Sequence, residues 1–344
     1  CRERKMTAIS IIMPLYNAAK YLRESLESLL CQSFVDFELI CVNDASMDDT
    51  MEILRDVQKK DSRVRVISNK GRSGAAYSRN KGMRGACGKY LAFLDGDDIF
   101  DERMLEKAYY TIEEKAADIV MYEYQHVPAD SIHQKLQRRH GERYKDRYCQ
   151  KTFTVQECEP YEFINWSTGP WNKLYRRAFI EECALSFQDL PNANDVYFVC
   201  MALMLSKSIT ILDDETVMVY VRDHFETHRI SSNRDSMCNY EALMKVGQEL
   251  IRRDKFDQLY EYFYYRVLFS LKDGLLADKN EERARAFYTF LQKEGIASLC
   301  ELGGHCYDKV DEYLRKEMSQ FKNKSFATGW YKEENALKVY LHKK

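Results

Sequence analysis

The first hundred residues alternate between short apolar runs and amphipathic helical patterns, and this alternation restricts the possible folds more than any other feature of the chain. Apolar runs cover 8–14, 38–42, 64–68 and 90–94, with helical patterns over 20–31, 48–61 and a third stretch that contains 78–80 and ends near 85–88. Strands that alternate with helices form right-handed crossovers and a mostly parallel sheet. We therefore predict an α/β fold in which helices flank a mostly parallel sheet.

Polar side chains gather where two of the predicted strands end. The second strand leads into Asn43-Asp-Ala-Ser46, and the fourth leads into Asp95, Asp97 and Asp98. In parallel sheets the carboxyl ends of the strands meet at one crevice, where ligands bind. Carboxylate oxygens suit Mg²⁺ or Mn²⁺, above all when the phosphates of a ligand complete the coordination shell. The alternative is an acidic turn that caps a helix starting at Asp101.

Four segments of this region occur in the order and spacing of a known family. They are Ile11-Ile-Met-Pro-Leu-Tyr-Asn17, Val42-Asn-Asp-Ala-Ser46 with Asp48 following, Ser78-Arg79-Asn80, and Phe93-Leu-Asp-Gly-Asp-Asp98. On these segments the chain resembles the family 2 glycosyltransferases, inverting enzymes of bacterial surface-glycan synthesis that have the GT-A fold and use nucleotide-sugar donors. Later segments that resemble the acceptor half of the family are Trp171–Arg177, Asn194–Phe198 and Val219–Arg222, so that the resemblance covers residues 7–235.

The resemblance implies a uridine diphosphate (UDP) sugar bound at the ends of these strands. Asp44 then accepts the hydrogen of the uracil imide, Asp95 reaches the ribose, and Asp97 binds Mn²⁺ or Mg²⁺. Such a cation neutralises phosphate charge on the leaving nucleotide. Asn43 replaces an aspartate that is common in the family, which weakens one polar contact. Asp98 either assists its neighbours or caps the next helix.

Other residues complete the implied donor site. Pro14 is expected to end the first strand, because proline cannot donate to a ladder, and Tyr16 to pack on the uracil face. Arg79 offers a planar fork of donors for the base or the phosphates. The alternatives are ordinary packing for Tyr16 and an exposed helix position for Arg79. The full donor-binding set is Pro14, Tyr16, Asn17, Asp44, Arg79, Asp95, Asp97, Arg222 and His224.

A direct displacement also needs a base that removes the proton of the acceptor hydroxyl. The resemblance assigns this role to Asp195 and places Asn194 and Trp171 on the acceptor side. Asp195 stands where a loop leads into a helix, so its alternative role is a helix cap. Packing is the alternative for Trp171. Asp189 and Asp130 are weaker candidates for the base.

Composition limits the partners and the compartment. With 54 acidic and 52 basic residues the chain lacks the basic excess of a general nucleic-acid-binding protein. No apolar run reaches the roughly 18 residues that a membrane span needs, and no secretory segment is evident. The eleven cysteines lack zinc spacing and fit reduced, buried thiols. We expect a cytoplasmic protein, with attachment to the inner face of the membrane as an option.

Three parts are expected: 1–125 as the nucleotide-sugar-binding half, 126–235 as the acceptor-binding half, and 236–344 as a helical module. The segment 135–151 carries seven basic residues against two acidic ones, which suits a solvated loop, an acceptor with a lipid diphosphate, or anionic lipids. The helical pattern over 256–276 is aromatic on more than one face. This fits burial, or contact with a membrane or a second copy in a homodimer.

The function that these patterns favour is transfer of a sugar from a UDP-sugar to a hydroxyl of a glycan or a lipid-linked acceptor. A sugar nucleotidyltransferase shares the α/β layout, but it usually has a glycine-rich, basic loop after the first strand, where this chain has Pro14-Leu-Tyr-Asn17. An inactive nucleotide-sugar-binding scaffold is the third option. Loss of the acidic triplet or of Asp195 would favour it, and both are present.

Overall fold

The computed structural model describes residues 7–128, 148, 151–160, 162–212, 218–223, 235–277 and 280–302. The chain divides into two compact units, the first made of Cys1–Glu157 with Ser167–His228 and the second of Cys158–Trp166 with Arg229–Lys344. The short segment Cys158–Trp166 thus belongs with the C-terminal helices, which the sequence did not indicate. The division of the first unit into a donor and an acceptor half stays a prediction.

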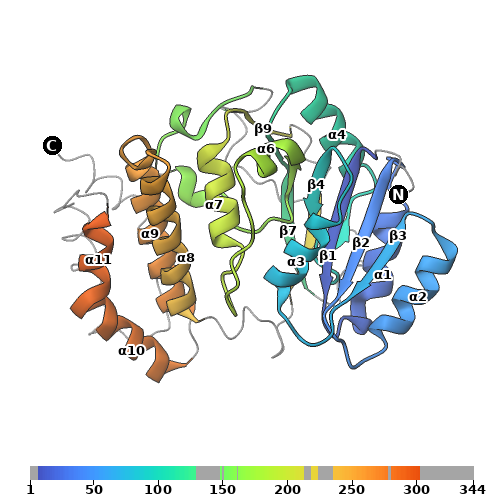
Figure 1. Ribbon diagram of the computed structural model, residues 1–344, viewed down its shortest axis with the longest axis horizontal. Helices are drawn as coiled ribbons and strands as arrows, with labels where there is room; N and C mark the ends of the chain where they lie inside the picture. The colour runs from blue at the N-terminus through green and yellow to red at the C-terminus, as the bar shows by residue number, and fades with distance from the viewer. Residues whose placement is uncertain are drawn as a thin grey trace. The chain divides into compact units, whose positions relative to one another are not determined.

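The first unit is built on a seven-stranded sheet with the order β3-β2-β1-β4-β8-β6-β9. The strands are β1 (Ile9–Leu15), β2 (Phe37–Asn43), β3 (Val64–Ser68), β4 (Tyr90–Phe93), β6 (Ile119–Met121), β8 (Lys173–Arg176) and β9 (Ile209–Ile211). β8 is antiparallel to both of its neighbours, and the other pairings are parallel. Figure 1 shows β3, β2, β1 and β4 in succession. The predicted α/β fold with a mostly parallel sheet is confirmed.

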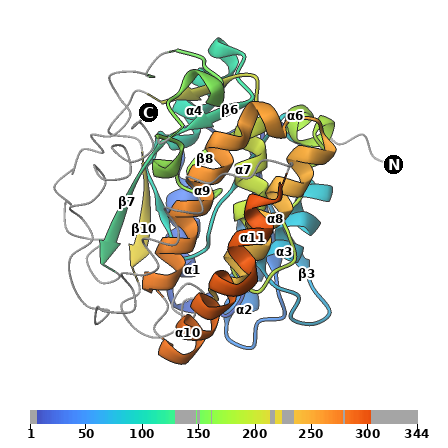
Figure 2. The same ribbon diagram turned by 90° about the vertical axis from the view of Figure 1, so that its left-hand side faces the viewer.

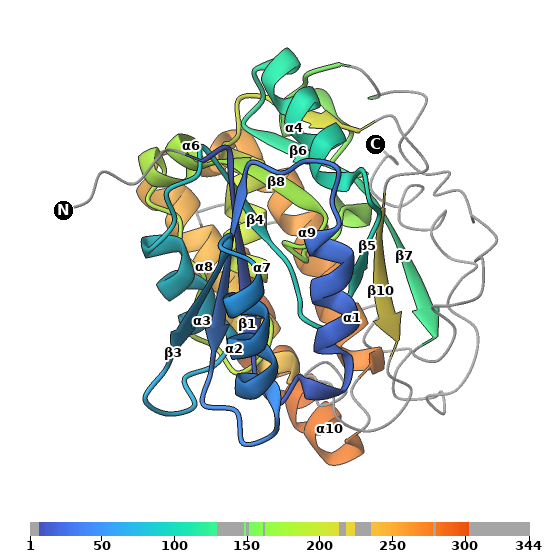
Figure 3. The same ribbon diagram turned by 90° about the vertical axis from the view of Figure 1, so that its right-hand side faces the viewer.

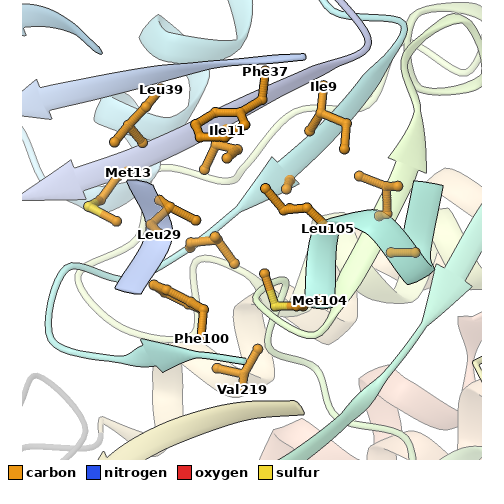
Figure 4. Packing of buried hydrophobic residues seen from close by; sticks show 14 of the residues in the cluster. Ile9, Ile11, Met13, Leu29, Phe37, Leu39, Phe100, Met104, Leu105 and Val219 are labelled. Carbon is orange, nitrogen blue, oxygen red and sulfur yellow. The ribbon is translucent and has the colours of Figure 1, made fainter. Parts of the chain in front are cut away.

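Helices cover both faces of this sheet, which explains why β1 and β2 are buried along almost their whole length. The helices of this unit are α1 (Ala19–Leu30), α2 (Thr50–Lys60), α3 (Ala75–Arg84), α4 (Met104–Lys115), α6 (Arg177–Glu182) and α7 (Val196–Leu205), with a 3₁₀ turn at Val155–Glu157. On one face α1, α2 and α4 enclose a core that includes Ile11, Leu29 and Met104 (Figures 3 and 4). On the other face α3 approaches closely, because a Cβ on Gly82 would lie only 2.5 Å from Cγ2 of Ile12.

Two details of the strand ends differ from the sequence expectations. Pro14 does not end β1, which continues to Leu15. The ladder between β1 and β4 already stops at the Ile12–Phe93 pair, so the missing N–H of Pro14 breaks no bond on that side. The helix expected from Asp101 begins at Met104, after the short strand β5 (Ile99–Phe100).

A second sheet lies beside the acidic turn. It contains β5, β10 (Met218–Asp223) and β7 (Glu123–Pro128) in that order, with β10 antiparallel to β5 and parallel to β7. Figure 3 shows these strands together. Because β5 directly follows residues 95–98, its pairing with β10 ties the acidic turn to the 218–223 segment.

The second unit is helical (Figure 2). It contains α8 (Ser236–Arg252), α9 (Phe256–Ala277), α10 (Glu281–Phe290), a π-helical turn (Leu291–Gly295) and α11 (Ile296–Cys300), together with the 3₁₀ turn Glu162–Asn165. α9 is packed from two sides within this unit: the Tyr262 hydroxyl donates to the Cys158 carbonyl at 2.8 Å, and the Tyr264 hydroxyl to the Leu299 carbonyl at 3.0 Å. Most of its aromatic residues are core residues, among them Phe263 and Tyr264, whereas Phe269 is exposed. Among the described residues, no helix has the length and apolarity needed to cross a bilayer.

Candidate active site

The loops that follow β1 and β2 are bound to each other at the carboxyl edge of the sheet. The Asn17 amide donates to Oγ of Ser46 at 3.0 Å, and Oδ1 of Asn17 accepts from the Met47 amide at 2.8 Å. The Ala18 amide donates to Oγ1 of Thr50 at 2.8 Å. Asn17 has a left-handed φ of 49°, which asparagine tolerates better than most residues. The exposed Asn17 side chain thus joins two loops at the predicted nucleotide site.

Asp44 is buried below the loop that precedes α3. Its Oδ1 accepts from Nδ2 of Asn69 at 2.7 Å and from the Ser73 amide at 2.8 Å, and its Oδ2 accepts from the Gly74 amide at 2.8 Å. A carboxylate offers about four acceptor positions, so one position remains at Oδ2. Asp44 therefore holds the loop in place, and its contact with a uracil imide stays a prediction.

Tyr16 lies half-buried just after β1, and its ring is already covered on one face. The guanidinium carbon of Arg72 lies 4.4 Å from the ring centroid. Arg72 is exposed and belongs to the same loop that Asp44 holds. Pro14 is half-buried at the end of β1. The three predicted pocket residues Pro14, Tyr16 and Asn17 thus lie together at one edge of the sheet.

The three carboxylates of the acidic turn have different surroundings. Oδ1 of Asp95 pairs with the Arg79 guanidinium at 2.9 Å. Asp98 is only 2% exposed, and its Oδ1 accepts from the Arg222 amide at 3.1 Å. Asp97 is half-buried between them. None of the three caps α4, whose N-terminal cap position is Arg103, so the capping alternative is wrong.

Arg222 supports this turn from β10. Its Nε donates to the Asp97 carbonyl at 2.8 Å, and one of its terminal nitrogens pairs with Glu24 at 2.7 Å. The guanidinium also lies 4.3 Å from the Tyr21 ring centroid, and the residue is 2% exposed. Arg222 therefore fixes the backbone that carries Asp97. A direct contact between Arg222 and the donor stays a prediction.

Arg79 connects the acidic turn to the start of α7. One terminal nitrogen binds Asp95, and the other donates to Oδ1 of Asn194 at 3.0 Å, across 115 residues of sequence. The guanidinium lies 5.3 Å from the Phe187 ring centroid, and the residue is 6% exposed. The alternative of an exposed helix arginine is therefore wrong. Arg79 brings together residues that the sequence assigned to the donor and the acceptor.

Asp195 occupies the N-terminal cap position of α7, but its side chain accepts no capping hydrogen bond there. Burial raises the pKa of its carboxyl, and the negative charge of Asp95 raises it further, while the positive charges of Arg79 and Lys173 lower it. A carboxylate whose pKa lies above its ordinary value is a stronger base when it is ionised. The capping alternative finds no support in this geometry, whereas the catalytic role stays a prediction. Asp189, the weaker candidate, is exposed.

Trp171 lies in a turn that leads into β8. Its ring centroid is 4.6 Å from that of Tyr124, and its carbonyl accepts from the Tyr122 hydroxyl at 3.2 Å. The next two residues are Asn172 and Lys173, and Lys173 is completely buried. Lys173 falls within the family-like segment Trp171–Arg177, but the resemblance implies no role for it. Lys173 follows a polar residue, Asn172, at the start of the short strand β8, and this pattern does not distinguish it from an exposed lysine.

A second missed residue is Tyr175, on β8. It is completely buried and packs against Phe93 and Phe198, at centroid distances of 5.9 and 5.5 Å. Burial raises its pKa well above the ordinary value, with further contributions from Tyr122 and Asp195. Its phenol has no hydrogen-bond partner among the described residues. No sequence signal distinguished Tyr175 from the other 23 tyrosines of the chain.

The acidic turn fits a divalent cation that arrives with a diphosphate. Within the described part of the chain, no group of three or more His, Cys, Asp or Glu side chains is placed to hold a metal ion. Asp95 is paired with Arg79, and Asp98 accepts from the Arg222 amide. The ligand role of Asp97 rests on the resemblance to the family and stays a prediction. Mg²⁺ and Mn²⁺ sites often use one or two carboxylates and complete their coordination with phosphate oxygens and water.

Some predicted features lie outside the described residues. These are His224, the weaker base candidate Asp130, and almost all of the basic segment 135–151. Contacts with a membrane, through that segment or the C-terminal helices, and formation of a homodimer stay predictions.

Comparison with known proteins identifies the family. The model of the family described as "Glycosyl transferase family 2" matches residues 10–183, which is half of the chain. The chain belongs to glycosyl transferase family 2. The match contains Asp44, Arg79 and the acidic turn, whereas Asn194 and Asp195 lie beyond its end.

Two glycosyltransferases resemble part of the chain. Glycosyltransferase GlyG of Streptococcus pneumoniae is 35% identical over 175 residues, covering 50% of this chain and 54% of its own. The uncharacterized glycosyltransferase EpsJ of Bacillus subtilis is 31% identical over 207 residues, covering 60% of this chain and 59% of its own. The chain thus matches little more than half the length of these relatives.

Solved structures extend the likeness of fold to nearly the whole chain. Residues 1–349 of TarS from S. aureus, in complex with UDP-GlcNAc, align with a TM-score of 0.66 at 22% identity, covering 90% of this chain and 92% of that TarS fragment. The mannosyltransferase PcManGT of Pyrobaculum calidifontis, in complex with GDP-Man and Mn²⁺, gives 0.54 at 16% identity, covering 98% and 86%. The likeness to both structures confirms the fold class.

Proposed function

We propose that this protein transfers a sugar from a UDP-sugar to a hydroxyl of a glycan or lipid-linked acceptor, with inversion at the sugar carbon and with the help of Mn²⁺ or Mg²⁺. The observation that carries the proposal is the pair of bonds from Arg79 to Asp95 and Asn194. A transferase has to hold its donor beside a base. Arg79 brings the acidic turn, where we expect the diphosphate, next to the start of α7, where we expect the base.

Donor binding uses the carboxyl edge of the sheet. In this proposal the uracil packs at Tyr16, and its imide donates to the remaining acceptor position of Asp44. Asp95 accepts from the ribose hydroxyls while it stays paired with Arg79. Asp97 would hold the cation, whose positive charge would stabilise the leaving diphosphate.

Transfer then requires one proton movement and one displacement. Asp195 accepts the proton of the acceptor hydroxyl as the oxygen attacks the anomeric carbon from the face opposite the diphosphate. The bond between that carbon and the diphosphate oxygen breaks, and its electron pair leaves with UDP. The products are an inverted glycoside, UDP and a protonated Asp195, which returns its proton to water.

The comparisons support the choice of donor class. TarS was crystallised with UDP-GlcNAc, and also with UDP alone. Support for a divalent cation comes from PcManGT, whose structure contains Mn²⁺ with its GDP-mannose donor. The transferred sugar and the acceptor are not assigned by these likenesses.

Replacing Asp97 tests the proposal directly. We expect Asp97→Ala to lose the Mn²⁺-dependent part of UDP affinity while its melting temperature stays near the parental value, because this strand-end carboxylate is not part of the core. Isothermal calorimetry with UDP, with and without Mn²⁺, measures the effect. Glu102→Ala, which removes an exposed acid four residues after Asp98, is the matched control and should bind as the parent does.

The outcomes separate the three functions under consideration. Unchanged Mn²⁺-dependent UDP affinity in Asp97→Ala would show that the metal assignment is wrong. Release of UDP from a panel of UDP-sugars supports a glycosyltransferase, and release of pyrophosphate from a sugar phosphate and UTP would indicate a nucleotidyltransferase instead. A parent that binds UDP but turns over no sugar nucleotide, with or without acceptor, would indicate a scaffold.

A further inference from the structure

A completely buried lysine organises the turn that carries Trp171. The Lys173 ammonium donates to the Ser167 carbonyl at 2.8 Å, the Gly169 carbonyl at 2.9 Å and Oδ1 of Asn172 at 2.7 Å. An ammonium group has three N–H donors, and these contacts use all three. A buried charge is tolerated only when it is well hydrogen-bonded, so the turn 167–172 has to keep its carbonyls directed at Lys173.

The position of Trp171 depends on this turn. A Cβ on Gly169 would lie 2.4 Å from Nε1 of Trp171, so the indole packs directly on the glycine backbone. The Gly169 amide donates to Oγ of Ser167 at 3.0 Å, which closes the turn on itself. The indole also meets Tyr124 in an edge-to-face contact. Fixing the Gly169 carbonyl therefore also fixes the indole.

The asparagine of the turn is bound on a second side. Nδ2 of Asn172 donates to the Tyr122 carbonyl at 3.1 Å, while the Asn172 carbonyl accepts from the Tyr122 amide at 3.0 Å. Asn172 thus joins Lys173 to Tyr122, the residue that directly follows β6. The turn is held by the sheet and by Lys173 together, and the positive charge of Lys173 reaches the carboxyl of Asp195.

We propose that Lys173 is a positioning residue for the acceptor: it fixes the turn 167–172 and so holds the Trp171 indole as a wall for the acceptor sugar. The inference rests on the proposed function, and it extends that function to a residue that touches neither substrate. An indole offers a broad apolar face, and the C–H face of a pyranose ring packs on such surfaces. If the turn 167–172 became mobile, affinity for UDP would stay unchanged, whereas the acceptor sugar would bind more weakly because the indole would no longer be held in place.

The test compares Lys173→Met with Lys207→Met, which removes an exposed lysine of the same unit. The acceptor probe is the p-nitrophenyl glycoside that the parent glycosylates best in a panel. We expect KM for this glycoside to rise about tenfold or more in Lys173→Met, since small displacements of positioning groups have effects of this size. UDP affinity, measured by calorimetry, should stay close to the parental value. Lys207→Met should match the parent in both.

Hydrogen exchange measures the turn itself. Amides of 167–172 should exchange faster in Lys173→Met, while those of β1 and β4 keep their protection. Gly169→Ala provides a second variant if Lys173→Met fails to fold, because the added Cβ displaces Trp171 and leaves Lys173 unchanged. It should show the same rise in KM with normal UDP affinity.

Several results would overturn the inference. They are a parental KM in both Lys173→Met and Gly169→Ala, a loss of UDP affinity as large as the rise in KM, or unchanged exchange at 167–172 in Lys173→Met. If the parent binds no UDP and transfers no sugar, the proposed function fails and the acceptor role fails with it. The exchange experiment then still decides whether Lys173 holds the turn, so the two failures are distinguishable.

Discussion

The predicted donor side and the predicted acceptor side of the first unit are held together in different ways. On the donor side, hydrogen bonds join neighbouring strand–helix units: Asn17 to Ser46 across 29 residues, and Asp44 to Gly74 across 30. On the acceptor side, the decisive bonds join distant parts of the chain, such as Arg79 to Asn194 across 115 residues. The loops after β1 and β2 are thus joined by contacts between consecutive strand ends. The acidic turn, which Arg222 holds across 124 residues, and the predicted acceptor side depend on tertiary packing.

The carboxylates proposed to act on the two sides, Asp44 and Asp195, differ in how their charge is hydrogen-bonded. Asp44 is surrounded by amide donors that satisfy its charge. Asp195 accepts no cap hydrogen bond, and burial raises its pKa. A carboxylate that accepts several hydrogen bonds holds a loop in place and selects its ligand. A carboxylate with a raised pKa is a stronger base once it is ionised. The comparison therefore predicts that changes at Asp195 affect turnover and that changes at the base pocket affect binding.

The largest expected effect is that of Asp195→Asn. The substitution removes the base, and it should lower sugar transfer by about 100-fold or more, the usual scale for a general base. Affinity for UDP and Mn²⁺ should be unchanged, because the donor contacts lie elsewhere. Transfer assays and calorimetry on the same preparation measure both quantities. Asp189→Asn, an exposed aspartate in the same loop, is the control. If Asp189→Asn lost transfer and Asp195→Asn did not, the base would be Asp189.

A smaller effect is expected in the base pocket. UDP should bind more tightly than CDP, because cytosine lacks the imide hydrogen and leaves the last acceptor position of Asp44 unpaired. An unpaired buried acceptor costs about 1–3 kcal/mol, or about 5- to 150-fold in affinity. The two nucleotides carry the same diphosphate, so competition between them isolates the base. Equal affinities would show that Asp44 only holds its loop.

The sequence predicted the strands that carry the proposed donor site, because these strands are consecutive in the chain and each has a clear apolar pattern. The apolar runs located β1 to β4 within one or two residues, and the polar clusters followed from them. It could not show that Arg222 supports the acidic turn, since that requires the pairing of β5 with β10. Nor could it show the role of Lys173, because three of its contacts are to main-chain and amide oxygens that carry no motif. Side chains that bind backbone leave little trace in a sequence.

The smallest effect concerns the stability of the protein without nucleotide or metal. The pKa of Asp195 is raised in the folded state, so the folded state binds its proton more tightly than the unfolded chain does. The stability that this proton provides is present at low pH and is lost as the pH rises through the folded-state pKa. Asp195→Asn has no such proton. The melting temperature of the variant relative to the parent should therefore be higher at pH 7 than at pH 4.

Arg79 and Lys173 attract the ionised carboxyl and reduce this difference, while Asp95 increases it. Differential scanning calorimetry at the two pH values measures it, and Asp189→Asn again serves as the control. A helix cap would behave in the opposite way, because removal of a cap lowers stability at the pH where the carboxylate is charged. A variant that melted well below the parent at pH 7 but not at pH 4 would therefore indicate a cap. In that case the contrast between an ordering carboxylate at Asp44 and a basic one at Asp195 would no longer hold.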